Sequence, residues 1–308
     1  MFFLYQIILS ILILVSPIII IFRIINNKED KIRFLEKFSI SSKKSKRRNL
    51  IWFHGASVGE IMSVIPLIKY YENKKSIDQI LITSSTLSSS KILKKYNLKK
   101  TIHQFYPIDH IFFVNIFLNY WRPKIAIFIE SEIWPCMFKK IEQKKIPLIL
   151  LNARLTKKTF KKWSIIKSFS EDVFSKIKFS YPQNDETKLY LQQMKSKKVN
   201  QIGNLKFIDY DDKSLSKINY NLKSEFNKKK VWVASSTHKD EEIFCAKAHI
   251  ELKKKVKNLI TIIIPRHIHR VKDIVLDLEK LNLKVNLHST KPKNLKFTDI
   301  YLVDTFGE

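Results

Sequence analysis

Residues 50–60 read LIWFHGASVGE, an apolar run followed by a short polar turn. The apolar residues at 50–53 predict a buried strand, because strands of a parallel sheet are covered on both faces. Beyond the turn, apolar residues recur at positions 61, 64, 65 and 68, a spacing that is typical of a helix. A strand that runs directly into a helix is the repeating unit of doubly wound sheets. This stretch therefore predicts an α/β fold.

The alternation of strand and helix continues along the chain. Apolar runs predict further strands at residues 80–83, 125–129, 147–151 and 179–181, and weaker ones at 102–106 and just before 202. Helical patterns between them include residues 162–178 and 186–194. A second series has predicted strands at 231–235, 259–265, 284–287 and 300–303, and helices at 239–256 and 269–281. Two Rossmann-like halves of this kind bind ligands between them, at the carboxyl ends of their strands.

A polar and poorly periodic segment at residues 208–229 is the expected linker between the two domains. Residues 50–207 then form the first domain, and residues 230–308 form a partial second domain. The two cysteines, Cys136 and Cys245, are too few for a disulfide framework and match no metal-ligand spacing. We therefore expect a reducing compartment and no metal site.

The composition is strongly basic and poor in glycine. The chain has 57 Lys and Arg against 28 Asp and Glu, a formal net charge of +29, and only 4 glycines. A Gly-rich phosphate loop is therefore excluded. AT-rich coding by itself would enrich lysine along the whole chain; the alternative is a surface for nucleic acid or for an anionic membrane. No nucleic-acid-binding signature occurs in the sequence, so nucleic acid is not an expected partner.

An almost uninterrupted apolar run covers residues 2–22. It is long enough to cross the roughly 30 Å hydrocarbon core of a bilayer as a helix. Basic residues follow this run rather than precede it, which is unlike a secretory signal and places the rest of the chain in the cytoplasm. The alternative is a helix along the membrane surface, since Pro17 could bend it. Residues 1–22 are therefore the expected membrane anchor, and residues 23–49 a basic juxtamembrane segment.

Acidic residues with possible catalytic roles follow two predicted strands. Ser57 and Glu60 have the spacing of a capping box at a helix start; alternatively, Glu60 faces the ligand cleft as a general base. Glu130 and Glu132 directly follow the strand at 125–129. Their alternation directs one carboxylate toward a site and the other away from it, unless both belong to a solvated helix start.

Cationic residues follow three other predicted strands. Arg154 follows the strand at 147–151, Lys206 lies just beyond residue 202, and Arg266 ends the strand at 259–265. Cations in such places bind phosphate or carboxylate groups, although each of them alone is more often a surface charge. Backbone N–H groups at a helix start would add to such an anion site.

Taken in order, these segments resemble the 3-deoxy-D-manno-octulosonic acid (Kdo) transferases of glycosyltransferase family 30. The resemblance begins with the apolar N-terminus and the basic residues behind it. It continues through the motifs HGASVGE, WRPK, IESEIWP, IPLILLNARLT, GNLKF, VWVASSTHKDEE, IIIPRH and DTFGE. Each motif alone is weak, but together they extend over the whole chain in the family's order, which makes the resemblance specific.

The resemblance implies a GT-B fold and metal-independent transfer of Kdo from CMP-Kdo to a lipid A precursor, lipid IVA. This reaction belongs to the cytoplasmic face of the bacterial inner membrane, so CMP-Kdo, the lipid A precursor and anionic membrane lipids are the implied partners. Glu60 is the implied general base, and Glu130 and Lys206 fall on positions that stabilise the transition state. The implied CMP-contacting residues are Pro265, Arg266, Phe306, Gly307 and Glu308.

The chain departs from the family pattern in three places, one of them at residues 181–185, where YPQND replaces the usual Gln or Ser-type strand end. The turn after residue 83 lacks the usual Pro and Gly, and family members continue well beyond the position of Glu308. The second domain is therefore expected to be incomplete, with an exposed sheet edge. Two alternatives remain open. One is an inactive membrane-anchored remnant that binds the lipid A precursor, and the other is a GT-B glycosyltransferase that uses another nucleotide sugar.

Overall fold

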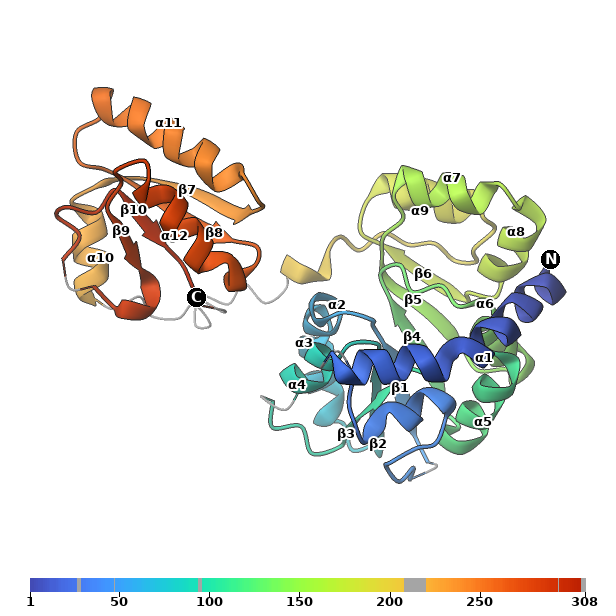
Figure 1. Cartoon of the computed structure of the whole chain (residues 1–308). Coiled ribbons are helices and arrows are strands. Elements are labelled where there is room, and N and C mark those ends of the chain that lie inside the picture. Colours follow the sequence, from blue (N-terminus) through green and yellow to red (C-terminus); the bar gives the residue numbers. More distant parts are fainter. Residues whose placement is uncertain (27–28, 47, 94–95, 208–219, 293, 306–308) are drawn as a thin grey trace. The chain divides into compact units, whose positions relative to one another are not determined.

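The computed structural model describes residues 1–26, 29–46, 48–93, 96–207, 220–292 and 294–305 (Figure 1). The chain divides into two compact units, Met1–Tyr210 and Asp211–Glu308. Each unit contains a sheet whose strands pair in parallel, and helices alternate with the strands along the chain. The predicted α/β class is therefore confirmed.

The first unit is built on a six-stranded sheet with the order β3-β2-β1-β4-β5-β6. Its strands are β1 (Leu50–His54), β2 (Gln79–Ser84), β3 (Thr101–Phe105), β4 (Ile125–Ile129), β5 (Leu148–Ala153) and β6 (Phe179–Pro182). The strand order reverses between β1 and β4, which pair at the centre of the sheet. Doubly wound sheets bind ligands at such a reversal, outside the carboxyl ends of the strands.

Both faces of this sheet are covered. The helices that connect the strands are α2 (Val58–Ser63), α3 (Ile65–Glu72), α4 (Leu87–Leu93), α5 (Ile111–Trp121), α6 (Pro135–Gln143), α7 (Lys157–Ser164) and α8 (Lys167–Ser175), and α9 (Asp185–Gln193) follows the last strand. Trp52 packs into the apolar cluster on one face of β1, and its neighbour Phe53 packs into the cluster on the other. Neither residue is exposed, which explains why β1 is apolar at consecutive positions.

Two elements differ from the sequence-based prediction. The helix predicted over residues 162–178 is two helices, α7 and α8, because Ile166 between them has φ −118° and ψ 66°, which does not continue a helix. The strand predicted before residue 202 is only an isolated bridge between Ser180 and Val199. Apolar residues recur at helical spacing across Ile166, so the pattern alone did not show the break between the two helices.

The open edge of the sheet at β3 is covered by a short helix, η1 (Arg33–Phe38). Arg33 Nη2 donates to the carbonyl of His103 at 2.8 Å, and Glu36 Oε2 accepts from the backbone N–H of Phe105 at 2.8 Å. These side chains occupy backbone groups on the free side of β3, which would otherwise be available to pair with another strand. The juxtamembrane segment is therefore part of the first unit.

The apolar N-terminus forms a single helix, α1 (Phe2–Ile25), which continues through Pro17. Within the described residues it is the one helix that is long and apolar enough to cross a bilayer. Near its start, Tyr5 donates a hydrogen bond to Asp109 at 3.0 Å. Near its end, Arg23 pairs with Glu29 at 3.1 Å, and Glu29 also pairs with Lys37 of η1. Both ends of α1 are thus attached to the first unit (Figure 1).

The second unit has a four-stranded sheet with the order β7-β8-β10-β9. Its elements are α10 (Tyr220–Asn227), β7 (Lys230–Thr237), α11 (Glu241–Lys255), β8 (Leu259–Pro265), η3 (Ile268–Arg270), α12 (Val271–Glu279), β9 (Val285–Leu287), η4 (His288–Thr290) and β10 (Ile300–Leu302). The predicted linker at 208–229 needs a correction. Residues 208–219 lie outside the described residues, but α10 packs Leu222 and Phe226 against Tyr301 and therefore belongs to the second unit.

Candidate active site

The turn after β1 holds Glu60 at the carboxyl end of the sheet. Ser57 is the N-cap of α2, and its Oγ accepts from the Glu60 backbone N–H at 3.3 Å. The Glu60 carboxylate in turn accepts from Ser57 Oγ at 2.9 Å and from the Ala56 N–H at 2.7 Å. Gly55 permits this close packing, since a Cβ there would lie 3.0 Å from the Cβ of Glu60. The structure thus contains the N-cap bond from Ser57, while the Glu60 carboxylate reaches the Ala56 N–H rather than the Ser57 N–H of a full capping box.

The capping bonds leave Glu60 able to act as a base. A carboxylate offers about four lone-pair positions, and two of them are used by Ser57 and Ala56. Burial raises the pKa of Glu60, and the negative charges of Glu132 and Glu130 raise it further against the lowering effect of the two hydrogen bonds. A raised pKa makes the ionised carboxylate a stronger base. The capping and catalytic interpretations are therefore compatible.

Glu132 forms a second polar group beside this turn. It accepts a hydrogen bond from Trp134 Nε1 at 2.9 Å, and its Oε2 lies 3.0 Å from Nε2 of the fully buried His54. His54 Nδ1 lies 3.0 Å from Thr83 Oγ1. Burial would raise the pKa of Glu132, but the His54 and Trp134 contacts outweigh burial and lower it. Glu132 is thus held as an anion at the end of β4.

Glu130 and Lys206 form an ion pair across the ends of two segments. Lys206 lies in η2 (Leu205–Phe207), and its Nζ is 2.6 Å from Glu130 Oε1. The Glu130 side chain is 9% exposed and that of Lys206 is 42% exposed. The approach does not meet hydrogen-bond geometry, since Glu130 Oε1 has no hydrogen-bond partner among the described residues. The contact is an ion pair that leaves a buried carboxylate oxygen able to accept another hydrogen bond.

Buried polar atoms without partners gather at this end of the sheet. In the described part of the first unit they include Tyr106 Oη, Glu130 Oε1 and Asn152 Nδ2, at the ends of β3, β4 and β5. Buried polar groups are usually hydrogen-bonded, so exceptions often mark functional positions. The pattern supports the carboxyl edge of this sheet as a site for a polar ligand.

The structure brings Glu60, Glu130 and Lys206 together in the first unit, whereas the other predicted site residues belong to the second. Pro265 and Arg266 lie at the carboxyl end of β8, where the Arg266 N–H donates to the Thr237 carbonyl at 2.9 Å. Phe306, Gly307 and Glu308 lie outside the described residues. No group of three or more His, Cys, Asp and Glu in the described residues could hold a metal ion.

Sequence reasoning missed the partners of these carboxylates. It named Glu132 but not its contact with His54, and it did not foresee that Asn152 contacts the segment that carries Lys206. The two missed residues, His54 and Asn152, each lie at the end of an apolar strand run, as the candidates found from the sequence do. That position was the available signal. The pairing itself depends on which strands are neighbours, which a single sequence does not state.

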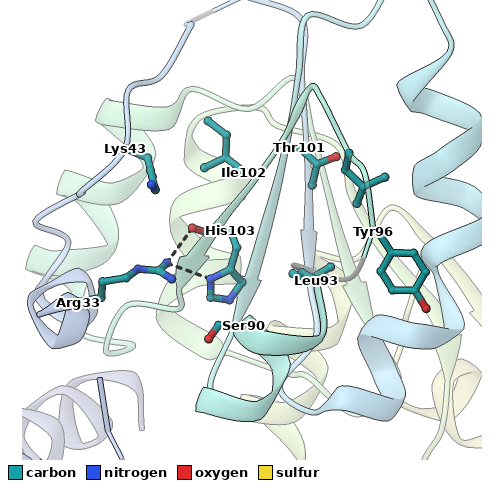
Figure 2. Close-up of a pocket in the computed structure, with 9 residues that line it drawn as sticks. Arg33, Lys43, Ser90, Leu93, Tyr96, Thr101, Ile102 and His103 are labelled. Carbon is teal, nitrogen blue, oxygen red and sulfur yellow. Dashed lines mark hydrogen bonds between the residues drawn. The ribbon is translucent and has the colours of Figure 1, made fainter. Parts of the chain in front are cut away.

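A cavity of ≈ 350 Å³ lies elsewhere in the first unit, along β3 (Figure 2). Its walls include Arg33, Lys43, Ser90, Leu93 and His103. The guanidinium of Arg33 is already bonded to His103 and to Glu36. None of the site residues predicted from the sequence lines this cavity, so it is distinct from the candidate active site.

Comparisons with known proteins agree on a family. The family model described as 3-deoxy-D-manno-octulosonic-acid transferase (kdotransferase) matches residues 32–209. The 3-deoxy-D-manno-octulosonic acid transferase of Rickettsia bellii (strain RML369-C) is 34% identical over 305 residues, which are 97% of this chain and 72% of that protein. The enzyme of the same name from Rickettsia felis (strain ATCC VR-1525 / URRWXCal2) is 36% identical over 85% of this chain, but the chain spans only 56% of its length.

A solved structure supports the fold. The UDP-GlcNAc 2-epimerase from Neisseria meningitidis, crystallised with UDP-GlcNAc, matches with a TM-score of 0.55 over 85% of this chain and 73% of that protein. The sequences are 13% identical, so the likeness concerns the fold alone. It confirms the predicted GT-B-like pair of Rossmann-like units.

Proposed function

The chain belongs to the 3-deoxy-D-manno-octulosonic acid (Kdo) transferase family, and from this premise we propose that it transfers Kdo from CMP-Kdo to a hydroxyl of a lipid A precursor, lipid IVA. The observation that carries the proposal is the grouping of Glu60 with the Glu130–Lys206 pair at the reversal of strand order. Glycosyl transfer needs a base for the acceptor and stabilisation of developing charge, and this group can supply both.

In the proposed reaction, Glu60 takes the proton of the acceptor hydroxyl. The acceptor oxygen then bonds to the anomeric carbon of Kdo as the bond from that carbon to the CMP phosphate breaks, and CMP leaves with the electron pair. The Lys206 ammonium, held 2.6 Å from Glu130, stabilises the charge that develops in the transition state. Because Lys206 is preorganised by Glu130, it does not need to reorient during the reaction.

The donor side of the proposal rests on the second unit. Pro265 is the last residue of β8 and Arg266 follows it, and a cation shortly before the next helix suits the phosphate of CMP-Kdo. Arg270 is held nearby by the buried Glu242, in two contacts of 3.1 Å, so it contributes to the framework rather than to an open cation site. We propose that transfer proceeds without a resident metal or cofactor.

We further propose that α1 anchors the chain to the cytoplasmic face of the bacterial inner membrane. A helix that spans a bilayer separates its ends by about 30 Å along the membrane normal. Tyr5 bonds to Asp109, and Arg23 pairs with Glu29, which in turn pairs with Lys37 of η1. These contacts hold both ends of α1 near one unit, which favours a helix that lies along the membrane surface. Its outward side is apolar, with Leu14 80% and Ile18 70% exposed. This arrangement presents the first unit to a lipid acceptor and to anionic lipids.

A donor-panel assay tests the proposal. The 308-residue chain is incubated in detergent with lipid IVA and with CMP-Kdo or other nucleotide sugars, and the product mass is measured. We expect an added Kdo from CMP-Kdo only. Transfer from a different donor would instead identify another GT-B glycosyltransferase. Binding of lipid IVA without transfer from any donor would identify an inactive remnant.

A further inference from the structure

Asn152 lies where β5 ends, and the backbone departs from a regular strand there. The register of β5 against β6 shifts between Leu151 and Ala153, so Asn152 is the extra residue of a β-bulge. Its φ is +53°, in the left-handed region that Asn tolerates better than most residues. Bulges beside active sites redirect side chains, and this bulge is one strand away from Glu130.

The buried side chain of Asn152 holds the segment that carries Lys206. Its Oδ1 accepts from the backbone N–H of Leu205 at 3.0 Å, and its carbonyl accepts from Gln183 Nε2 at 2.9 Å. Asn152 is 0% exposed, and its Oδ1 is occupied by the Leu205 bond. The Gln183 bond fixes the bulge, and the Leu205 bond fixes the start of η2. Lys206 is the next residue, so its backbone position depends on Asn152.

The series of contacts that begins at Asn152 ends at the ion pair between Lys206 and Glu130. Lys206 Nζ reaches Glu130 Oε1, and Glu130 follows β4, the strand that pairs with β5. Leu205 packs against the apolar cluster that includes Ile61 of α2, the helix whose first turn contains Glu60. The bond from Asn152 to Leu205 therefore places Lys206 relative to both carboxylates.

We propose that Asn152 is a positioning residue whose Oδ1 anchors η2 and thereby sets Lys206 against Glu130. Its catalytic consequence rests on the proposed function, but the placement of Lys206 is a property of the first unit alone. The competing explanation is that Asn152 only tolerates the strained bulge. Glycine separates the two, because it accepts a positive φ without strain but has no side-chain acceptor.

The first experiment measures the reactivity of Lys206 in the full chain. Asn152→Gly, Glu130→Gln and the control Asn184→Gly are acetylated in detergent, and modification of each lysine is followed by mass spectrometry. Asn184 is a matched control, because its Oδ1 also accepts one backbone N–H, at 2.9 Å, outside the candidate site. A partly exposed ion pair slows the reaction modestly. We expect Lys206 to react about two- to fivefold faster in Asn152→Gly and in Glu130→Gln, and at the wild-type rate in Asn184→Gly.

Unchanged Lys206 reactivity in Asn152→Gly would overturn the proposal, and so would unchanged reactivity in Glu130→Gln, since the pair would then not exist in solution. This readout needs no turnover. If the wild-type chain transfers no Kdo, the proposed function fails while the labelling result still decides the role of Asn152.

The second experiment uses turnover to ask whether Asn152 acts through Lys206. The kcat for Kdo transfer is measured for Asn152→Gly, Lys206→Ala and the double variant. Misplacing a catalytic group by about 1 Å costs up to roughly 100-fold, so we expect Asn152→Gly to lose on the order of tenfold or more. The double variant should match Lys206→Ala alone. Multiplied losses in the double variant would show that Asn152 acts elsewhere and would reject the proposal.

Discussion

Glu60 illustrates how one side chain can serve the fold and the chemistry. Its backbone N–H donates to Ser57 Oγ, as the spacing of a capping box predicts, whereas its carboxylate accepts from Ser57 Oγ and from the Ala56 N–H. Its carboxylate nevertheless keeps lone pairs free, and burial together with two neighbouring acidic residues raises its pKa. The local interaction therefore orients the carboxylate that the proposed reaction uses.

The first prediction separates these two roles of Glu60. Glutamine keeps one oxygen that can accept from the Ala56 N–H, and its amide group can donate to Ser57 Oγ, but it cannot take a proton. We expect Glu60→Gln to lower turnover by about 10²–10⁴-fold, the usual contribution of general base catalysis, with CMP-Kdo binding unchanged in calorimetry.

Thr156→Ala provides the control for the loss of a helix cap. Thr156 caps α7 by accepting from the Thr159 N–H at 3.2 Å, outside the candidate site. Its removal should reduce stability by about 1 kcal/mol and leave turnover intact. Wild-type turnover in Glu60→Gln would show that another group is the base.

At the scale of elements, η1 completes the sheet by binding the edge of β3. The backbone carbonyl of His103 in β3 accepts a hydrogen bond from Arg33 Nη2. The same Nη2 lies 3.0 Å from His103 Nδ1. Burial and the positive charge of Arg33 lower the pKa of His103 to about 3. The contact of Arg33 with His103 Nδ1 therefore requires a neutral histidine, which makes this part of the edge sensitive to acid.

The second prediction follows from that pKa. The unfolded His103 binds a proton below about pH 6.5, whereas the folded one does not until about pH 3. Its contribution to stability is thus complete above about pH 6.5 and is lost as the pH falls toward 3. Between pH 6.5 and 5, the difference in unfolding free energy between wild type and His103→Gln should fall by about 2 kcal/mol.

Urea unfolding of both proteins in detergent measures this difference. The comparison with the variant is needed because burial raises the pKa of Asp109 to about 7, and that group gains stability as the pH falls. A difference that stays constant over this pH range would contradict the buried neutral state of His103.

At the scale of the whole molecule, the charge of +29 acts together with α1. Lysines are spread over the chain, so they provide a general attraction to anionic lipids that salt weakens. Insertion of the exposed apolar side of α1 into the membrane buries apolar surface, and salt does not weaken this contribution to binding. The two contributions are therefore separable by ionic strength.

The third prediction uses this difference. The wild-type chain should remain on anionic vesicles at high salt and should also bind zwitterionic vesicles. Lysine at both Leu14 and Ile18, which are 80% and 70% exposed, should make binding weak and salt-dependent, as measured by cosedimentation. The control Leu276→Lys changes a 57% exposed position of α12 and should leave vesicle binding at high salt unchanged. Equal retention of the α1 variant at high salt would show that α1 is not the anchor.

The sequence by itself predicted the alternation of strands and helices, because a strand covered on both faces must be apolar at consecutive positions, as at Trp52 and Phe53. It also located Glu60, Glu130 and Lys206, because the polar residues that end such strands are conspicuous. It could not show the break between α7 and α8, because apolar residues recur across it, or the helix at Tyr220–Asn227, because a short element leaves little periodicity in the chain.

The motifs of the sequence determined the family, and strand polarity determined which end of the sheet carries polar groups. Only the tertiary structure decided how those groups pair. Glu132 contacts His54, Lys206 contacts Glu130, and Asn152 holds Leu205. These contacts join residues from separate strand ends, and the order of strands in a sheet arises from the packing of the whole unit. Local sequence fixes a residue's place along its own strand, but its neighbours across the sheet are chosen by the fold.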